Sequence, residues 1–170
     1  MRINRKTIYF AKDREDVIIP TKRDEDAGYD IYANFVEHLY VIQPHETKMI
    51  PTGLRSAFHK KWYIQLEERG STGTKGIAQR CGVIDSGYRG EWMIPITNTT
   101  DKAMVICKAD TVQEVRDEFG DDVIIYPYEK AICQAVVHKV PKLKRKEITV
   151  EQLMQINSER GTGKTGSSGK

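Results

Sequence analysis

Residues 131–140 read AICQAVVHKV and residues 62–67 read WYIQLE, two apolar stretches of strand length that are rich in β-branched and aromatic side chains. Such side chains suit a pleated sheet. Four further stretches share this character: FVEHLYVI at 35–42, KMIPTG at 48–53, EWMIPITN at 91–98 and DVIIYPY at 122–128. Turn residues recur between them. Evenly spaced short strands without long helices between them predict an all-β fold, a sandwich or barrel.

Two stretches interrupt the β pattern and predict short helices. Residues 109–120, ADTVQEVRDEFG, have apolar side chains at helical spacing, with Asp110 as candidate N-cap and Gly120 as candidate stop. Residues 148–157, ITVEQLMQIN, place Gln152 three residues after Thr149, which is the pattern of a capping box. We therefore expect one or two short helices beside the sheets.

The composition limits the class of protein. A chain of 170 residues favours one domain that buries a core without disulfides or metal. The net charge of +3 is small and interspersed, so we expect no nucleic-acid partner. No apolar run reaches the roughly 18 residues of a membrane span, and residues 1–16 lack the apolar core of a signal peptide. These features predict no membrane association and a cytoplasmic location.

The cysteines and histidines give no sign of a metal centre. The chain has three cysteines, Cys81, Cys107 and Cys133, without a CxxC pair, and four histidines without HxxxH spacing. These patterns argue against a disulfide framework and against a zinc site. We expect the thiols to be reduced and largely buried.

The C-terminal residues 158–170, SERGTGKTGSSGK, contain no apolar side chain larger than threonine and cannot form a core of their own. Residues 163–165, GKT, imitate the end of a phosphate-binding P-loop. The motif requires a glycine where this chain has Ser158, and no helix can follow. We predict a flexible arm whose glycines, serines and Arg160 can still bind phosphate.

Three inner stretches carry candidate chemistry. Residues 68–76, ERGSTGTKG, are either an anion-binding turn or an ordinary loop. Residues 82–91, GVIDSGYRGE, predict a tight hairpin that holds Asp85 near Tyr88, and Asp85 is either a base beside a ring or a turn-forming residue. In residues 26–33, DAGYDIYA, Asp30 either contacts a metal or faces solvent.

Taken in order, these stretches resemble the five motifs of the trimeric deoxyuridine triphosphatase (dUTPase) family. The matching segments are AGYDIYA at 27–33, RGSTGTKG at 69–76, GVIDSGYRG at 82–90, AICQAVV at 131–137 and RGTGKTGSSG at 160–169. The resemblance implies a distorted β-barrel or jelly roll over residues 1–157 and an arm at 158–170 that closes over the active site. It also implies a homotrimer with active sites shared between subunits, which hydrolyses dUTP to dUMP and pyrophosphate with Mg²⁺.

The same resemblance assigns roles to individual residues. Asp85 matches the general base that activates water for attack on the α-phosphate. Asp30 matches the carboxylate on the Mg²⁺ side, which acts through bound water. Tyr88 would pack under the deoxyribose. The other implied contacts are Arg69, Gly70, Ser71 and Gln134 with the phosphates, Gly82, Val83 and Ile84 with uracil, Gln79 and Met93 with the nucleotide, and Arg160, Gly166, Ser167 and Ser168 in the closing arm.

Three features depart from the family pattern. Gly70 stands where the second motif usually has serine, and Thr165 stands where an aromatic side chain usually stacks on uracil. We therefore expect a weaker lid over an active site that still works. The stretch at about 103–127 is longer than usual and resembles an insertion of some phage dUTPases. It is either a decoration, the favoured interpretation, or a docking site for a protein partner.

Two alternative functions follow from these considerations. A dCTP deaminase shares the implied fold, but its catalytic glutamate would align with Pro95, which cannot transfer a proton. The second alternative is a regulatory protein with the dUTPase fold that binds a protein partner through the 103–127 insertion. It is compatible with catalysis and stays open.

Overall fold

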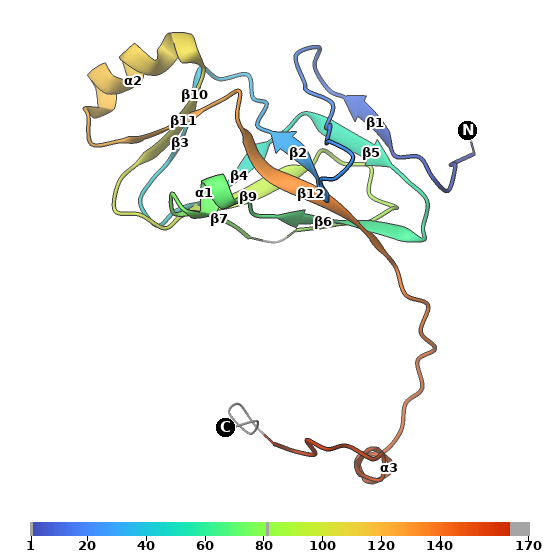
Figure 1. Cartoon of the computed structure of the whole chain (residues 1–170). Helices are drawn as coiled ribbons and strands as arrows, with labels where there is room; N and C mark the ends of the chain where they lie inside the picture. The colour runs from blue at the N-terminus through green and yellow to red at the C-terminus, as the bar shows by residue number, and fades with distance from the viewer. Residues whose placement is uncertain (1, 81, 164–170) are drawn as a thin grey trace. The chain divides into compact units, whose positions relative to one another are not determined.

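The computed structural model describes residues 2–80 and 82–163, and the chain divides into two compact units, Met1–Val140 and Pro141–Lys170. Within the described part of the first unit, twelve short strands form four small sheets, and the strand order of each sheet is open rather than closed on itself (Figure 1). The predicted all-β, jelly-roll-like class is confirmed, although the described strands do not close into a barrel.

The sheet that carries most of the candidate residues has the order β2-β12-β6-β8 and is antiparallel throughout. Its strands are β2 (Gly28–Tyr32), β12 (Ala131–Lys139), β6 (Trp62–Glu67) and β8 (Val83–Ile84). Ile64 and Leu66 of β6 are buried in the core, whereas their neighbour Gln65 on the opposite face is half-buried. One face of this sheet therefore packs on the core and the other carries polar side chains.

The remaining strands also contribute side chains to the core. They form the sheets β4-β9-β7, β1-β5 and β11-β10-β3. Their bounds are β1 (Tyr9–Lys12), β3 (Leu39–Ile42), β4 (Thr47–Pro51), β5 (Leu54–Ala57), β7 (Ile77–Gln79), β9 (Met93–Asn98), β10 (Met104–Cys107) and β11 (Ile124–Pro127). Trp92 is fully buried among them, and its indole N–H donates to Ser56 Oγ at 3.2 Å.

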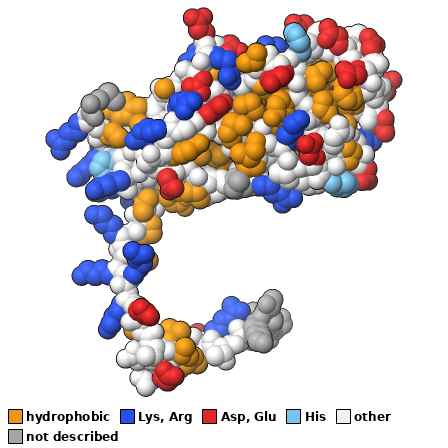
Figure 2. All heavy atoms as spheres, turned by 180° about the vertical axis from the view of Figure 1, so that it is seen from behind, with side chains coloured by type: hydrophobic (Ala, Val, Ile, Leu, Met, Phe, Trp, Pro, Cys, Tyr) orange, Lys and Arg blue, Asp and Glu red, His pale blue; other side chains and the backbone are white. Residues whose placement is uncertain are grey.

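The stretch at 103–127 is an integral part of the fold. Strands β10 and β11 run parallel, and β10 also pairs with β3. Helix α2 (Val112–Phe119) connects them and buries Val115 against Val105 and Cys107. Figure 2 shows acidic side chains gathered at the end of the first unit that carries α2 in Figure 1.

The predicted N-cap of this helix is wrong by one residue, because the N-cap is Thr111 rather than Asp110, whereas its predicted stop is confirmed. Asp110 lies inside a 3₁₀ turn, Ala109–Thr111, which the Thr111 hydroxyl closes by donating to Lys108 O at 2.8 Å. That turn shifts the start of α2 beyond Asp110. Gly120 has a φ of +76° and ends the helix, because this backbone conformation favours glycine.

The second unit contains the other predicted helix, α3 (Val150–Met154). Thr149 and Gln152 form the expected capping box: Thr149 Oγ1 accepts from Gln152 N–H at 3.2 Å, and Gln152 Oε1 accepts from Thr149 N–H at 3.0 Å. The helices in the described residues are all too short or too polar to span a bilayer.

Candidate functional site

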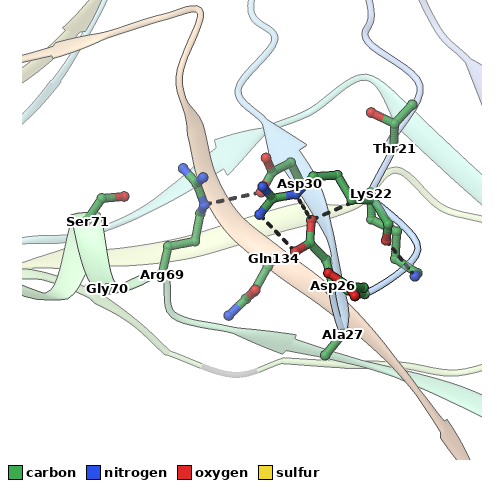
Figure 3. Close-up of a pocket in the computed structure, with 12 residues that line it drawn as sticks. Thr21, Lys22, Asp26, Ala27, Asp30, Arg69, Gly70, Ser71 and Gln134 are labelled. Atoms are coloured by element: carbon green, nitrogen blue, oxygen red, sulfur yellow. Dashed lines mark hydrogen bonds and ion pairs between the residues drawn. The ribbon is translucent and has the colours of Figure 1, made fainter.

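Three of the stretches singled out in the sequence meet at one cavity of about 860 Å³ (Figure 3). The loop at 21–27 and the start of β2 form one side, residues 69–71 form another, and β12 contributes Gln134. The cavity thus brings together Asp30, Arg69, Gly70, Ser71 and Gln134, five of the candidate residues.

The pairing of β12 explains why Gln134 and Asp30 lie side by side. Gln134 pairs with Asp30 of β2 on one side and with Glu67 of β6 on the other. Its amide nitrogen Nε2 donates to Glu68 O at 3.0 Å. Gly28 leaves room for this side chain, because a Cβ at Gly28 would lie 2.7 Å from Gln134 Oε1. The amide is therefore held at the cavity from two directions.

Arg69 is positioned by its own loop and by two neighbouring strands. Its Nε lies 3.2 Å from Asp30 Oδ1, and its Nη1 donates to Ala131 O at 3.0 Å. The buried hydroxyl of Thr72 accepts from Arg69 N–H at 3.2 Å and donates to Arg69 O at 2.8 Å. These bonds hold the turn ahead of α1 (Gly70–Gly73), and the exposed Ser71 hydroxyl follows directly. The guanidinium is therefore ordered in advance.

Two ionisable groups near Arg69 are neutral. Burial raises the pKa of the Cys133 thiol far above its usual range, so the thiol stays protonated. Burial also raises the pKa of Tyr126, whose hydroxyl donates to Ala131 O at 2.7 Å. The prediction of buried structural thiols is confirmed for Cys107 and Cys133, and Cys81 lies outside the described residues.

Asp85 is exposed at the start of a turn that follows β8. Tyr88 N–H donates to Asp85 O at 3.0 Å, which closes the turn, and Arg89 Nη1 donates to Ser86 O at 2.8 Å within it. The predicted turn is present, with Asp85 and Tyr88 at its two ends. Because these bonds join backbone to backbone and guanidinium to backbone, they fix the position from which the Asp85 carboxylate projects.

The prediction that the chain after this turn returns as the second strand of a hairpin is wrong. In the described part of the chain, β8 pairs with β6, and the chain after Tyr88 continues into β9, which pairs with β4 and β7. The Glu91 carboxylate accepts from Gly53 N–H at 2.6 Å and from Thr52 N–H at 3.1 Å. Together with the burial of Trp92, these bonds draw the chain away from β8 and into the other sheet.

The other candidates of the third motif lie around β8. A Cβ at Gly82 would lie 2.6 Å from Leu66 O, so only glycine permits this close approach to β6. Val83 is 58% exposed, whereas the Ile84 side chain is buried in the core and leaves only its backbone for a ligand. Tyr88 is 44% exposed, and its hydroxyl donates to Glu91 O at 2.9 Å.

The structure does not place every candidate at the cavity. The lining of the cavity includes none of Asp85, Tyr88, Gln79 and Met93. Gln79 lies on β7, where its N–H donates to Glu68 Oε1 at 3.0 Å, and Met93 is half-buried at the start of β9. Arg160 belongs to the second unit and donates from Nε to Gly163 O at 3.1 Å. Gly166, Ser167 and Ser168 lie outside the described residues.

Sequence reasoning missed the loop that forms one side of the cavity. Residues 21–26 read TKRDED, and Lys22, Arg23, Glu25 and Asp26 all line the cavity. The run of charged residues immediately before Ala27 was the feature of the sequence that could have indicated this side of the cavity. In residues 2–80 and 82–163, no three Asp, Glu, His or Cys side chains cluster closely enough to hold a metal by themselves.

Comparisons with known proteins agree with the motifs. Residues 14–114 match the family model described as dUTPase. The chain is 30% identical over 160 residues to deoxyuridine 5'-triphosphate nucleotidohydrolase of Nautilia profundicola, a match that covers 92% of this chain and 94% of that protein. It is also 34% identical over 99 residues to the Pol polyprotein of caprine arthritis encephalitis virus, covering 58% of this chain but only 8% of the polyprotein.

A solved structure shares the fold. A point mutant of the dUTPase of Staphylococcus bacteriophage 80alpha, in complex with dUpNHpp, superimposes with a TM-score of 0.71 at 20% sequence identity, over 97% of this chain and 99% of that one. The family model spans more than half of the chain, and the Nautilia relative matches along nearly its whole length. This chain therefore belongs to the dUTPase family.

Proposed function

We propose that this chain hydrolyses dUTP to dUMP and pyrophosphate. The observation that carries the proposal is the cavity in which Asp30, Arg69, Ser71 and Gln134 converge in a member of the dUTPase family. The name of the Nautilia relative and the dUpNHpp complex of the phage enzyme support the choice of substrate.

Arg69, Ser71 and Gln134 supply the contacts that a triphosphate needs. The guanidinium presents a planar set of donors that matches phosphate oxygens, and the Ser71 hydroxyl and the Gln134 amide add neutral donors. Gly70 offers no side chain, so Ser71 supplies the hydroxyl of this loop. Because Arg69 is already tethered to Asp30 and Ala131, little side-chain entropy is lost when phosphate binds.

Asp30 fits a Mg²⁺ ion that is held chiefly by the substrate. Its side chain is 38% exposed and lines the cavity. Mg²⁺ keeps several waters while taking one or two carboxylates together with substrate phosphates. Bound there, Mg²⁺ would neutralise charge on the triphosphate and favour departure of pyrophosphate. We expect Asp30 to act through metal-bound water, because Arg69 already occupies one side of the carboxylate.

Asp85 serves as the general base in this proposal. The carboxylate accepts a proton from a water molecule while the water oxygen attacks the α-phosphorus in line with the departing pyrophosphate. Val83 and the backbone beside it contact uracil, and Tyr88 lies under the deoxyribose, where it leaves no space for a 2′-hydroxyl. The closed turn at Asp85 keeps the base and the nucleoside contacts in fixed relation.

We infer that the active enzyme is a homotrimer with shared sites. Asp85 and Tyr88 do not line the cavity of their own chain, so a neighbouring subunit would supply them. One face of the first unit exposes apolar side chains that assembly would cover (Figure 2). The arm at 158–170, with Arg160, Gly166, Ser167 and Ser168, would close over the phosphates and exclude water.

The variant Asp85→Asn tests the proposal. Hydrolysis is measured as pyrophosphate release with Mg²⁺ from dUTP, dTTP, dCTP and UTP, and binding of α,β-imido-dUTP is measured by calorimetry. We expect the native chain to act on dUTP alone and Asp85→Asn to lose at least about a hundredfold in kcat with analogue binding retained, as befits loss of a general base. Native-like turnover by the variant would remove Asp85 as the base, and turnover of dCTP would overturn the substrate.

A further inference from the structure

The charged loop at residues 21–26 borders the cavity, but none of its residues has a role in the proposed hydrolysis. Thr21 O accepts a hydrogen bond from Asp30 N–H at 3.1 Å, so the loop folds back beside the candidate metal-side carboxylate. Asp26 N–H donates to Arg23 O at 3.2 Å and closes the tip. The loop therefore has a defined conformation at the edge of the phosphate site.

Arg23 and Asp26 form a two-point ion pair inside this loop. Arg23 Nε lies 2.9 Å from Asp26 Oδ2, and Arg23 Nη2 lies 3.0 Å from Oδ1. The hydrogen bond from the Arg23 side chain is the main reason that the pKa of Asp26 lies below its usual value. In the view of Figure 3, Asp26 lies on the other side of Asp30 from Arg69. The pair thus extends the row of charges along the cavity wall.

The two arginines of the cavity differ in how firmly they are held. The Arg69 side chain is 29% exposed and is bonded to Ala131 O as well as to Asp30. The Arg23 side chain is 88% exposed, and Asp26 is the carboxylate within ion-pair distance of it in the described part of the chain. An exposed ion pair contributes little to stability and exchanges partners readily. Arg23 can therefore leave Asp26 for a stronger anion.

The charge balance of the cavity makes such an exchange favourable. Three cationic side chains, Lys22, Arg23 and Arg69, face three anionic ones, Glu25, Asp26 and Asp30. These charges cancel, although the proposed substrate carries about four negative charges, each of which attracts a guanidinium strongly. We propose that Arg23 is a phosphate-binding residue that Asp26 holds in readiness, and that it exchanges this carboxylate for the phosphates distal to the nucleoside. This inference rests on the proposed function.

Substitution of the two partners of the pair should change triphosphate binding in opposite directions. Calorimetry with α,β-imido-dUTP and α,β-imido-dUDP in Mg²⁺ gives the preference for the triphosphate over the diphosphate. We expect Arg23→Gln to lower this preference about tenfold, because one charge-assisted contact is lost, and Asp26→Asn to raise triphosphate affinity about threefold, because a competing carboxylate is removed. If the ion pair only supported the structure of the loop, Arg23→Gln and Asp26→Asn would both lower triphosphate affinity.

Matched variants separate the explanations. Asp24→Asn removes a charge from the same loop but outside the cavity lining, so we expect it to leave the preference unchanged. If the affinity gained in Asp26→Asn comes from the released Arg23 side chain, the double variant Arg23→Gln with Asp26→Asn should not show this gain in triphosphate affinity. A gain that persists, or an Arg23→Gln variant with native preference, would overturn the inference. Failure of the native chain to bind either analogue would instead overturn the proposed function.

Discussion

Gly28 controls whether the Gln134 amide can face the cavity. A Cβ at this position would lie 2.7 Å from Gln134 Oε1 and 3.0 Å from Gln134 Cβ, so Gly28→Ala must push the side chain away from Glu68 O. We expect kcat/KM for dUTP to fall at least about tenfold, because a misplaced substrate contact affects catalysis strongly. Steady-state kinetics checks this expectation.

The control for this variant is Gly73→Ala, since a Cβ at Gly73 would make only an ordinary contact of 3.5 Å with Glu68 Oε2. Melting temperatures of both variants show how much of any loss is due to unfolding. If Gly28→Ala hydrolyses dUTP at the native rate, then Gln134 is not held by the space that Gly28 leaves, and its proposed contact with phosphate would need another basis.

Residues within recognisable motifs could be predicted from the sequence, whereas residues that reach the cavity only through the folding of a loop could not. Asp30 and Gln134 lie on strands, and Arg69 lies in the turn between β6 and α1. All three belong to motifs, so the resemblance identified them, and the cavity brings them together. Arg23 and Asp26 belong to no motif. Their importance depends on the fold-back of the loop through Thr21 O and Asp30 N–H, which composition does not reveal.

At the scale of elements, most strands with an apolar or alternating pattern were predicted, but β10 was missed although all four of its residues are apolar. All six predicted strand stretches contain strands. β1, β5 and β7 are only three or four residues long, and their polar positions hide the pattern. The hairpin after Asp85 failed because Glu91 binds the distant backbone of Thr52 and Gly53, a tertiary contact that turn chemistry cannot anticipate.

Helix α2 is expected to support the fold rather than the chemistry. Val115 is fully buried in the small cluster with Val105 and Cys107. We expect Val115→Ala to lower the free energy of unfolding by about 1 to 3 kcal/mol, because it leaves a cavity in a packed cluster. Urea denaturation measures the loss, and Glu118→Ala on the exposed face of the same helix is the control.

The kinetics of Val115→Ala distinguish decoration from a catalytic role for the 103–127 stretch. Because β10 and β11 keep their pairing with β3 and with each other, the folded variant should retain its native kcat/KM for dUTP. A fall in kcat/KM at temperatures where the variant is fully folded would mean that α2 positions the active site.

At the scale of the whole molecule, the separation of Asp85 from the cavity predicts that catalysis requires more than one chain. Asp85→Asn removes the proposed base, and Arg69→Ala removes a phosphate contact from the cavity. Each variant alone should be inactive. Light scattering should give three times the 19.5 kDa of one chain for both, so that assembly itself is unaffected.

Mixing the two inactive variants then distinguishes shared sites from sites within one chain. The chains are unfolded together in equal amounts, refolded and assayed with dUTP. If each site takes Asp85 from one subunit and Arg69 from another, random assembly leaves about one site in four with both residues intact, so about a quarter of native activity should return. If both residues act within one chain, no mixed trimer contains an intact site, and the mixture should stay as inactive as its components. That result would contradict the shared site while leaving the proposed reaction intact.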